Sequence, residues 1–375
     1  MPKILENLPE WRSESGTFAP RRIYAADDTL PADTAYRLAC EGNGLLWQGD
    51  FQNARHLLQA MARRADKKPK KRHTPIEPTE VAHAFHLHRQ ATGQRARTLG
   101  MLLIPLEGDY SIPLRRAPDW RTACFEAWGA PTGEAFMVPL RELLGLVGAH
   151  EWRKKGVKIS ALGPPANNRI YPHYGVFSPV RGEYIDLVSQ APIAHKNLAF
   201  DIGVGTGVLS AVLAKRGVQR IVATDQDARA IACAKENLDR LRLLNKVELI
   251  QTHLFPEGQA PLIVCNPPWV PTRPSSAIEH AVYDENSQML RGFLSGLQTH
   301  LAPGGEGWLI LSDLAEHLGL RSRETLLLWI SESGLKVIDR LDIKPRHRKV
   351  TDATDPLHSA RAAETTSLWR LAISA

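Results

Sequence analysis

A glycine-rich segment in the second half of the chain has the composition of a ligand-binding turn. Residues 198–202 are apolar apart from one acid, Asp201, and glycines follow at alternate positions, Gly203, Gly205 and Gly207. Because glycine has no Cβ, the chain can turn sharply off a strand, take positive φ and let a ligand approach the main chain. Asp201 could then accept a hydrogen bond from an ammonium group or order the turn. A turn without any ligand is the alternative.

A second acid narrows the kind of ligand. Asp225 follows an apolar run twenty-four positions after Asp201, and a carboxylate at the end of the next strand can accept both hydroxyls of a ribose. A dinucleotide-binding turn would place a third glycine at position 208, where the chain has Val208. These residues therefore favour an adenosine that carries an amino acid over a nicotinamide dinucleotide.

A proline-rich segment could hold the molecule that reacts with this ligand. The apolar residues 262–265 stop at Asn266, Pro267, Pro268 and Trp269. Two prolines end strand pairing and stiffen the backbone, so the segment should form a rigid platform at the carboxyl end of a sheet. The Asn266 side-chain oxygen and the Pro267 carbonyl could each accept one hydrogen of an amide or aryl amine and aim its lone pair at an electrophilic group of the ligand. Trp269 would stack on the flat acceptor, unless the segment is only a turn and Trp269 only part of the core.

The elements that must position these residues alternate between strand and helix from about residue 197 onward, as in a parallel sheet covered by helices. Strands are predicted at 197–201, 220–224, 246–251, 261–265, 307–312, 335–343 and 366–373, and helices at 207–216, 227–244, 285–301 and 322–333. The last two strands have no convincing helix between them and are expected to pair antiparallel. The prediction is an α/β fold with a doubly wound, Rossmann-like sheet of seven strands. On such a sheet, Gly205 and Asn266 must lie on one face within the length of a small molecule.

The first part of the chain, residues 1–165, shows no such alternation and is predicted to be a separate α+β module that recognises the substrate. Helices are expected at 33–41, 51–64 and 79–90, and a hairpin at 98–105 and 110–114. A charged loop is expected at 67–72. The segment Gly163-Pro164-Pro165 is a plausible hinge, which leaves residues 166–375 for the catalytic domain.

The charge distribution favours an anionic partner. The chain has a formal net charge of +7, and residues 51–100 alone hold eleven Lys or Arg against three acids. A second basic patch is formed by residues 346–349. Basic stretches of this kind suit RNA or DNA, although many are only solvated loops.

Other features indicate a protein of the reducing cytoplasm without a membrane partner. No apolar run approaches the roughly eighteen residues of a membrane-spanning helix, and the N-terminus lacks the apolar centre of a secretory signal. The four cysteines are scattered at positions 40, 124, 233 and 265. We predict no metal site, because His83, His86 and His88 have no cysteine or acid nearby to complete a ligand set.

The two motifs, at this spacing, resemble those of the class I S-adenosylmethionine methyltransferases. The similarity covers about residues 170–315 and is greatest to the Asn-Pro-Pro-aromatic N-methyltransferases, which include the release-factor glutamine methyltransferases and the adenine or guanine N-methyltransferases of nucleic acids. The resemblance implies that S-adenosylmethionine is the cofactor. It also implies these roles: Asp201, Gly203 and Gly205 line the methionine and ribose, Asp225 holds the ribose, Asn266 and Pro267 bind the target nitrogen, and Trp269 stacks on the acceptor.

The sequence departs from this family at two places. Residues 174–184 resemble the segment before the first strand of the glutamine-modifying members, but one extra residue precedes Arg181 and the second acid of the pattern is missing. Phe177 and Arg181 remain candidates beside the cofactor. His253 stands where relatives carry an acid that grips the adenine, so backbone contacts or stacking by Phe255 would have to substitute. The predicted cofactor-binding residues are thus Asp201, Gly203, Gly205, Gly207, Asp225, His253, Phe177 and Arg181.

The sequence therefore predicts an N-methyltransferase whose acceptor is a planar amide or exocyclic amine of a macromolecule. A base of rRNA or tRNA is favoured by the basic patches, and a protein glutamine by the partial match at 174–184. A small-molecule acceptor is a third possibility. A non-catalytic binding protein that kept the fold is the alternative from another class.

Overall fold

The computed structural model describes residues 3–6, 8–67, 81–165, 167–273, 279, 282–346, 355 and 357–374. The chain divides into two compact units, Met1–Glu77 with His86–Glu151, and Pro78–Phe85 with Trp152–Ala375. The boundary expected near residue 165 thus falls inside the second unit, where Ile159 and Leu162 belong to the hydrophobic core. Most of the expected basic loop (68–72) and of the second basic patch (347–349) lies outside the described residues.

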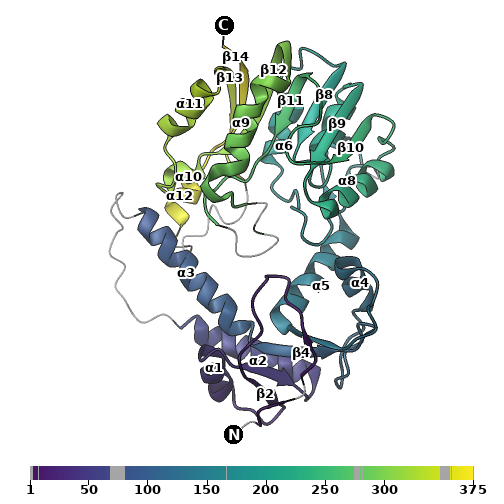
Figure 1. Cartoon of the computed structure of the whole chain (residues 1–375), viewed down its shortest axis with the longest axis vertical. Helices are drawn as coiled ribbons and strands as arrows, with labels where there is room; N and C mark the ends of the chain where they lie inside the picture. Colours follow the sequence, from purple (N-terminus) through teal and green to yellow (C-terminus); the bar gives the residue numbers. More distant parts are fainter. Residues whose placement is uncertain are drawn as a thin grey trace. The chain divides into compact units, whose positions relative to one another are not determined.

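The first unit is built on a five-stranded sheet with the order β1-β5-β4-β3-β2. Its strands are β1 (Glu10–Trp11), β2 (Ile23–Ala26), β3 (Gly44–Trp47), β4 (Leu102–Leu106) and β5 (Phe136–Pro139). Its helices include α1 (Ala32–Cys40), α2 (Phe51–Ala65) and α4 (Arg121–Trp128), while α3 (Val81–Leu99) and α5 (Leu140–Lys155) have residues in both units (Figure 1). Strands β2, β3 and β4 are parallel, so this unit does contain the alternation of strand and helix that we did not expect there.

The hairpin predicted at 98–105 and 110–114 is wrong. Strand β4 pairs instead with β3 and, antiparallel, with β5. Tyr110 is 2% exposed and has a φ of 71°, and its ring contacts Trp128 and Phe136 edge-on. Burial of this aromatic ring therefore holds the chain in a tight turn, closed by the Tyr110 N–H on the Glu107 carbonyl, where we expected a second strand.

The second unit contains the predicted seven-stranded sheet, in the order β10-β9-β8-β11-β12-β14-β13 (Figure 1). The strands are β8 (Leu198–Ile202), β9 (Arg220–Asp225), β10 (Val247–Gln251), β11 (Ala260–Cys265), β12 (Leu301–Ser312), β13 (Leu335–Ile343) and β14 (Thr366–Ile373). The first five strands of this order are parallel, and β14 is antiparallel to β12 and β13. The antiparallel pairing predicted for the last two strands is confirmed.

Helices cover both faces of this sheet, and the pattern of β11 shows how. Leu262 and Val264 join one core cluster with α6 (Glu183–Gln190), α7 (Val208–Lys215) and α8 (Ala228–Arg240). Ile263 and Cys265 point to the other face and join α9 (Gln288–His300) and α11 (Arg323–Glu332). A strand buried on both faces reads as a continuous apolar run, which is the signature of a parallel sheet covered by helices.

The remaining elements of the second unit are short. They are β6 (Val157–Lys158), β7 (Arg169–Ile170), the 3-10 turns η2 (Ser160–Leu162) and η4 (Glu285–Ser287), α10 (Leu314–His317) and α12 (His358–Ala363). Helix α8 ends at Arg240, four residues before the predicted end, because Arg242 has a left-handed φ of 58°. In the described part of the chain, every helix is too short or too polar to cross a membrane.

Candidate functional site

Three neighbouring parallel strands, β9, β8 and β11, bring the predicted site residues to one edge of the sheet. Ile202 pairs with Thr224 on one side and with Cys265 on the other, and adjacent strands lie about 4.8 Å apart. The residues that follow, Gly203, Asp225 and Asn266, therefore emerge side by side. All three line one cavity of ≈ 780 Å³, and so does Gly205. Cavities of about 300–1,000 Å³ are typical of small-molecule sites, and the expectation that Gly205 and Asn266 share one face is met.

The glycine turn has the backbone geometry that its sequence suggests. Gly203, Gly205 and Gly207 have φ values of 78°, 51° and 80°, in the left-handed region that side chains disfavour. A Cβ at Gly203 would lie 2.8 Å from Met289 Cε, whereas a Cβ at Gly205 would meet no heavy atom of the described residues within 4 Å. Gly205 is thus the point at which a ligand can come closest to the backbone.

Gly207 has a different position from the other two glycines. It does not line the cavity, and a Cβ there would lie 3.3 Å from atoms of Ala234 and Leu238 in α8. The absence of a side chain at Gly207 therefore lets α7 start close to α8. This placement gives Gly207 a packing role and no contact with the cavity.

Asp201 is a buried acid with one oxygen to spare. Asp201 is 1% exposed, and its Oδ2 accepts a 2.6 Å hydrogen bond from Ser210 Oγ. Its Oδ1 is buried and has no hydrogen-bond partner among the described residues. Burial raises the pKa of Asp201 to about 6. A buried acceptor without a partner is costly. Asp201 does not line the cavity, so its predicted contact with an ammonium group stays a prediction.

Asp225 lines the cavity and ties the glycine turn to β9. Its Oδ2 accepts the Gly205 N–H at 3.0 Å, and its Oδ1 accepts the Asp227 N–H at 3.0 Å. Burial raises the pKa of Asp225. Each carboxylate oxygen has a second lone pair, so the pair of oxygens can still accept two hydroxyls from a ligand in the cavity.

The Asn-Pro-Pro-Trp segment differs from its prediction at Trp269. The indole Nε1–H donates a 2.9 Å hydrogen bond to Asn266 Oδ1, and the partly buried ring packs against three hydrophobic clusters. Asn266 and Pro268 line the cavity, whereas Pro267 and Trp269 do not. The stacking surface that the sequence suggested at Trp269 is therefore turned into the protein, where the indole holds the Asn266 carboxamide.

Tyr283 and Asp284 line the cavity as well, although no sequence motif singled them out. Tyr283 forms a bridge with Val270, and the Asp284 N–H donates to the Val270 carbonyl at 2.9 Å. This contact places both residues beside the Asn-Pro-Pro-Trp segment. The Asp284 carboxylate accepts the backbone N–H groups of Met289 and Leu290 at the start of α9, and burial raises its pKa.

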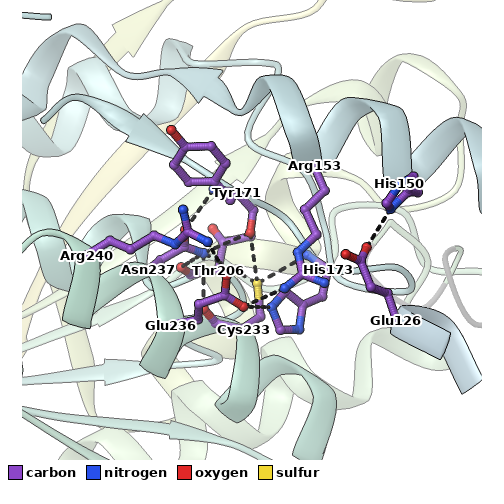
Figure 2. Close-up of polar contacts among 10 residues, drawn as sticks. All are labelled: Glu126, His150, Arg153, Tyr171, His173, Thr206, Cys233, Glu236, Asn237 and Arg240. Carbon is purple, nitrogen blue, oxygen red and sulfur yellow. Dashed lines mark hydrogen bonds and ion pairs between the residues drawn. The ribbon is translucent and has the colours of Figure 1, made fainter. Parts of the chain in front are cut away.

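Residues 175–177 supply another wall of the cavity, and a polar network holds the segment that leads to them (Figure 2). Asn237 is 1% exposed; its Oδ1 accepts the Tyr171 N–H at 2.7 Å, and its Nδ2 lies within hydrogen-bond distance of the Tyr171 and Thr206 carbonyls. His173 Nε2 lies 2.7 Å from Glu236 Oε2. One asparagine of α8 thus fixes both the glycine turn, through Thr206, and the segment that carries Phe177.

The remaining predicted residues are placed less uniformly. Phe177 and His253 line the cavity. Arg181 does not; it lies near Glu364, whose pKa is raised by burial and lowered in part by the Arg181 charge. Phe255 stacks on His300 at a centroid distance of 4.4 Å and on Phe293 at 5.8 Å. Phe255 is thus part of the packing against α9 and does not line the cavity, so the suggested adenine stacking by this ring is wrong.

The charges of the cavity suit a cationic ligand. Among the described residues, four acids line it, Asp225, Asp227, Asp284 and Glu285, against one arginine, Arg273, and no lysine. Several carboxylates also lie around the buried Cys265. Burial is the main cause that raises the pKa of the Cys265 thiol, and the charges of Asp201, Asp284 and Asp225 raise it further.

Comparison with known proteins agrees with this site. Residues 167–322 match the family model described as the methyltransferase small domain. A tRNA1(Val) (adenine(37)-N6)-methyltransferase of Shewanella loihica is 28% identical over 211 residues, which cover 52% of this chain and 84% of the relative. A release factor glutamine methyltransferase of Geobacter sulfurreducens is 34% identical over 40% of this chain and 54% of its own. A protein of Methanocaldococcus jannaschii, named as a candidate protein N5-glutamine methyltransferase, is 29% identical over 38% of this chain and 75% of its own.

Proposed function

We propose that this protein methylates an exocyclic amine of a base in rRNA or tRNA. The premise is that residues 167–322 belong to the methyltransferase small domain family and that the protein is an S-adenosylmethionine-dependent N-methyltransferase. The observation that carries this proposal is that Gly205, Asp225 and Asn266 line a single cavity. A donor bound at the first two residues would therefore lie next to an acceptor bound at the third.

The residues present fit the cofactor. Asp225 would accept the ribose hydroxyls, and Gly203 and Gly205 would let the ligand approach the main chain. Asp201 does not line the cavity, so we assign it to ordering the glycine turn through its hydrogen bond with Ser210. S-adenosylmethionine supplies an electrophilic methyl group on a positively charged sulfur. Four carboxylates on the cavity wall favour that charge. Phe177 and His253 are the cavity residues that we assign to the rest of the cofactor.

Asn266 would orient the acceptor nitrogen. Its Oδ1 already accepts the Trp269 N–H, and an amide oxygen has a second lone pair for one hydrogen of the acceptor amine. In our proposal the Pro267 carbonyl accepts the other hydrogen, so that the nitrogen lone pair is aimed at the methyl group. Because the indole N–H is only a donor and the carboxamide NH2 accepts no hydrogen bond, Trp269 fixes the Asn266 oxygen toward the indole. We therefore assign Trp269 a positioning role, and we assign stacking on the base to Tyr283, which lines the cavity beside Asn266.

A nucleic-acid base is the acceptor that these features favour. A base is flat and suits the Tyr283 ring, since stacking on aromatic side chains is a general mode of RNA recognition. The relative from Shewanella loihica is named for adenine N6 methylation of a tRNA. Protein glutamine is the second candidate, because the relative from Geobacter sulfurreducens is named for that acceptor and a glutamine amide presents the same pair of N–H groups.

Mass spectrometry of RNA and protein from a deletion strain tests the proposal. We expect one N-methylated base to be missing from rRNA or tRNA and to return when the intact gene is supplied, but not with Asn266→Ala. If a methylated glutamine disappears and all RNA methylation is unchanged, the nucleic-acid proposal is wrong and the second candidate takes its place.

A further inference from the structure

A stretch of the second unit that leads to the cavity is basic and contains no acid. Residues 152–182 include six Lys or Arg and no Asp or Glu. Arg153 is neutralised, because it forms a 2.6 Å ion pair with Glu236. Lys155, Lys158 and Arg169 are exposed and form no ion pair within the described part of the chain.

The fold gathers these three cations in one place. Strands β6 and β7 pair antiparallel with Lys158 opposite Arg169. The Arg169 guanidinium donates hydrogen bonds of 2.9 Å to the Lys155 carbonyl and 3.1 Å to the Gly156 carbonyl. Trp152 lies one helical turn before, with its carbonyl accepting the Gly156 N–H, and is 56% exposed. We call Trp152, Lys155, Lys158 and Arg169 the β6–β7 surface.

This surface is anchored to the wall of the cavity. Gly156 has a φ of 65°, and a Cβ there would lie 2.8 Å from the Tyr171 ring. The same ring has the Arg240 guanidinium 4.6 Å above its centroid, and the Tyr171 main chain is held by Asn237 (Figure 2). From Arg169 the chain reaches Gly175, a cavity residue, in six steps, so the two lie at most about 22 Å apart. That distance corresponds to a few nucleotides of a single strand.

We propose that the β6–β7 surface binds the phosphate backbone of an RNA strand beside the base that enters the cavity. Three exposed cations without an ion pair in the described part of the chain attract phosphates, and an exposed indole offers a face for a base. The cavity itself carries an excess of acids, so the phosphates must be held outside it. This inference rests on the proposed function and adds the path of the substrate strand.

Binding of a fluorescein-labelled oligoadenylate at increasing NaCl concentrations tests the surface. We compare the full-length protein with Lys155→Gln/Lys158→Gln and with a matched control, Lys196→Gln/Lys215→Gln. The control removes the same charge from exposed lysines at the opposite, amino edge of the sheet. Each phosphate contact on a single strand contributes about 0.7 to the slope of log affinity against log salt. The first variant should therefore lose about 1.4 of that slope and the control should lose none.

An unchanged slope in Lys155→Gln/Lys158→Gln, or an equal loss in the control, would overturn the inference. Equally tight binding of labelled polyglutamate would also overturn it, because it would show a general anion surface with no preference for RNA. Methyl transfer to bulk tRNA is measured separately with the same proteins. If tRNA is methylated with unchanged KM in the first variant, the surface is refuted and the proposed function stands; if the slope changes but no RNA is ever methylated, the proposed function fails and the surface stands.

Discussion

The indole of Trp269 gives the sharpest test of how the acceptor is oriented. Trp269→Phe keeps an aromatic ring at this position. It removes part of the indole together with the Nε1–H, which donates a 2.9 Å hydrogen bond to Asn266 Oδ1. One hydrogen bond of this kind contributes about 0.5–1.5 kcal/mol net. If that free energy keeps the Asn266 carboxamide in its productive orientation, kcat should fall by about 2- to 13-fold. The affinity for S-adenosylmethionine should not change, because Trp269 does not line the cavity.

The assay is steady-state transfer of a labelled methyl group, with cofactor binding measured by calorimetry. Trp308→Phe is the matched control, since Trp308 is fully buried and its indole donates a 3.1 Å hydrogen bond to Glu306 within β12 and not to Asn266. Both variants should lose some thermal stability, but only Trp269→Phe should lose turnover. A Trp269→Phe enzyme with full kcat would refute the positioning role, because a purely stacking residue tolerates phenylalanine.

Three further perturbations follow from the cofactor side of the site. Gly205→Ala should weaken S-adenosylmethionine binding by roughly tenfold or more, because its Cβ projects where no protein atom lies and its φ of 51° strains any side chain; unchanged affinity in calorimetry would contradict this. Asp201→Asn should stabilise the cofactor-free protein at pH 8 by up to roughly 3 kcal/mol, since the buried acid has its pKa raised from 3.8 to about 6. That gain should vanish as the pH falls from 6 to 4, where the native acid is protonated and no longer costs stability, and a constant gain across pH would sink the argument. Asn237→Ala should lower the free energy of unfolding by about 1–3 kcal/mol and loosen the Thr206 turn and the Tyr171 segment together. Faster hydrogen exchange at only one of these two segments would contradict this prediction.

The sheet of the second unit was largely predictable, because its strands are buried on both faces and separated by regular helices. Strands β13 and β14 begin and end where the sequence indicated, and Gly203, Gly205, Asp225 and Asn266 line one cavity as their spacing at strand ends required. Such positions follow from the rule that the carboxyl ends of parallel strands meet at one edge.

The side-chain directions were not predictable. Trp269 and Phe255 are aromatic residues next to the site that turn into the core, and burial of an indole or phenyl ring offsets any local preference for the cavity. Tyr283 and Asp284 reach the cavity only because their backbone pairs with Val270, a contact between loops that no periodicity reveals. In the first unit, strands of four residues such as β2 and β3 are too short for their pattern to stand out from the surrounding loops.

The most direct measurement of the central claim is a comparison of two quantities in one variant, Asn266→Ala. In this site Gly205 and Asp225 bind the donor, whereas Asn266 orients the acceptor. We expect calorimetry to show nearly unchanged S-adenosylmethionine affinity and the transfer assay to show a loss of about 10²- to 10³-fold in kcat. An equal loss of cofactor binding and transfer, or transfer that survives the substitution, would contradict the claim that Asn266 holds the acceptor against the methyl donor.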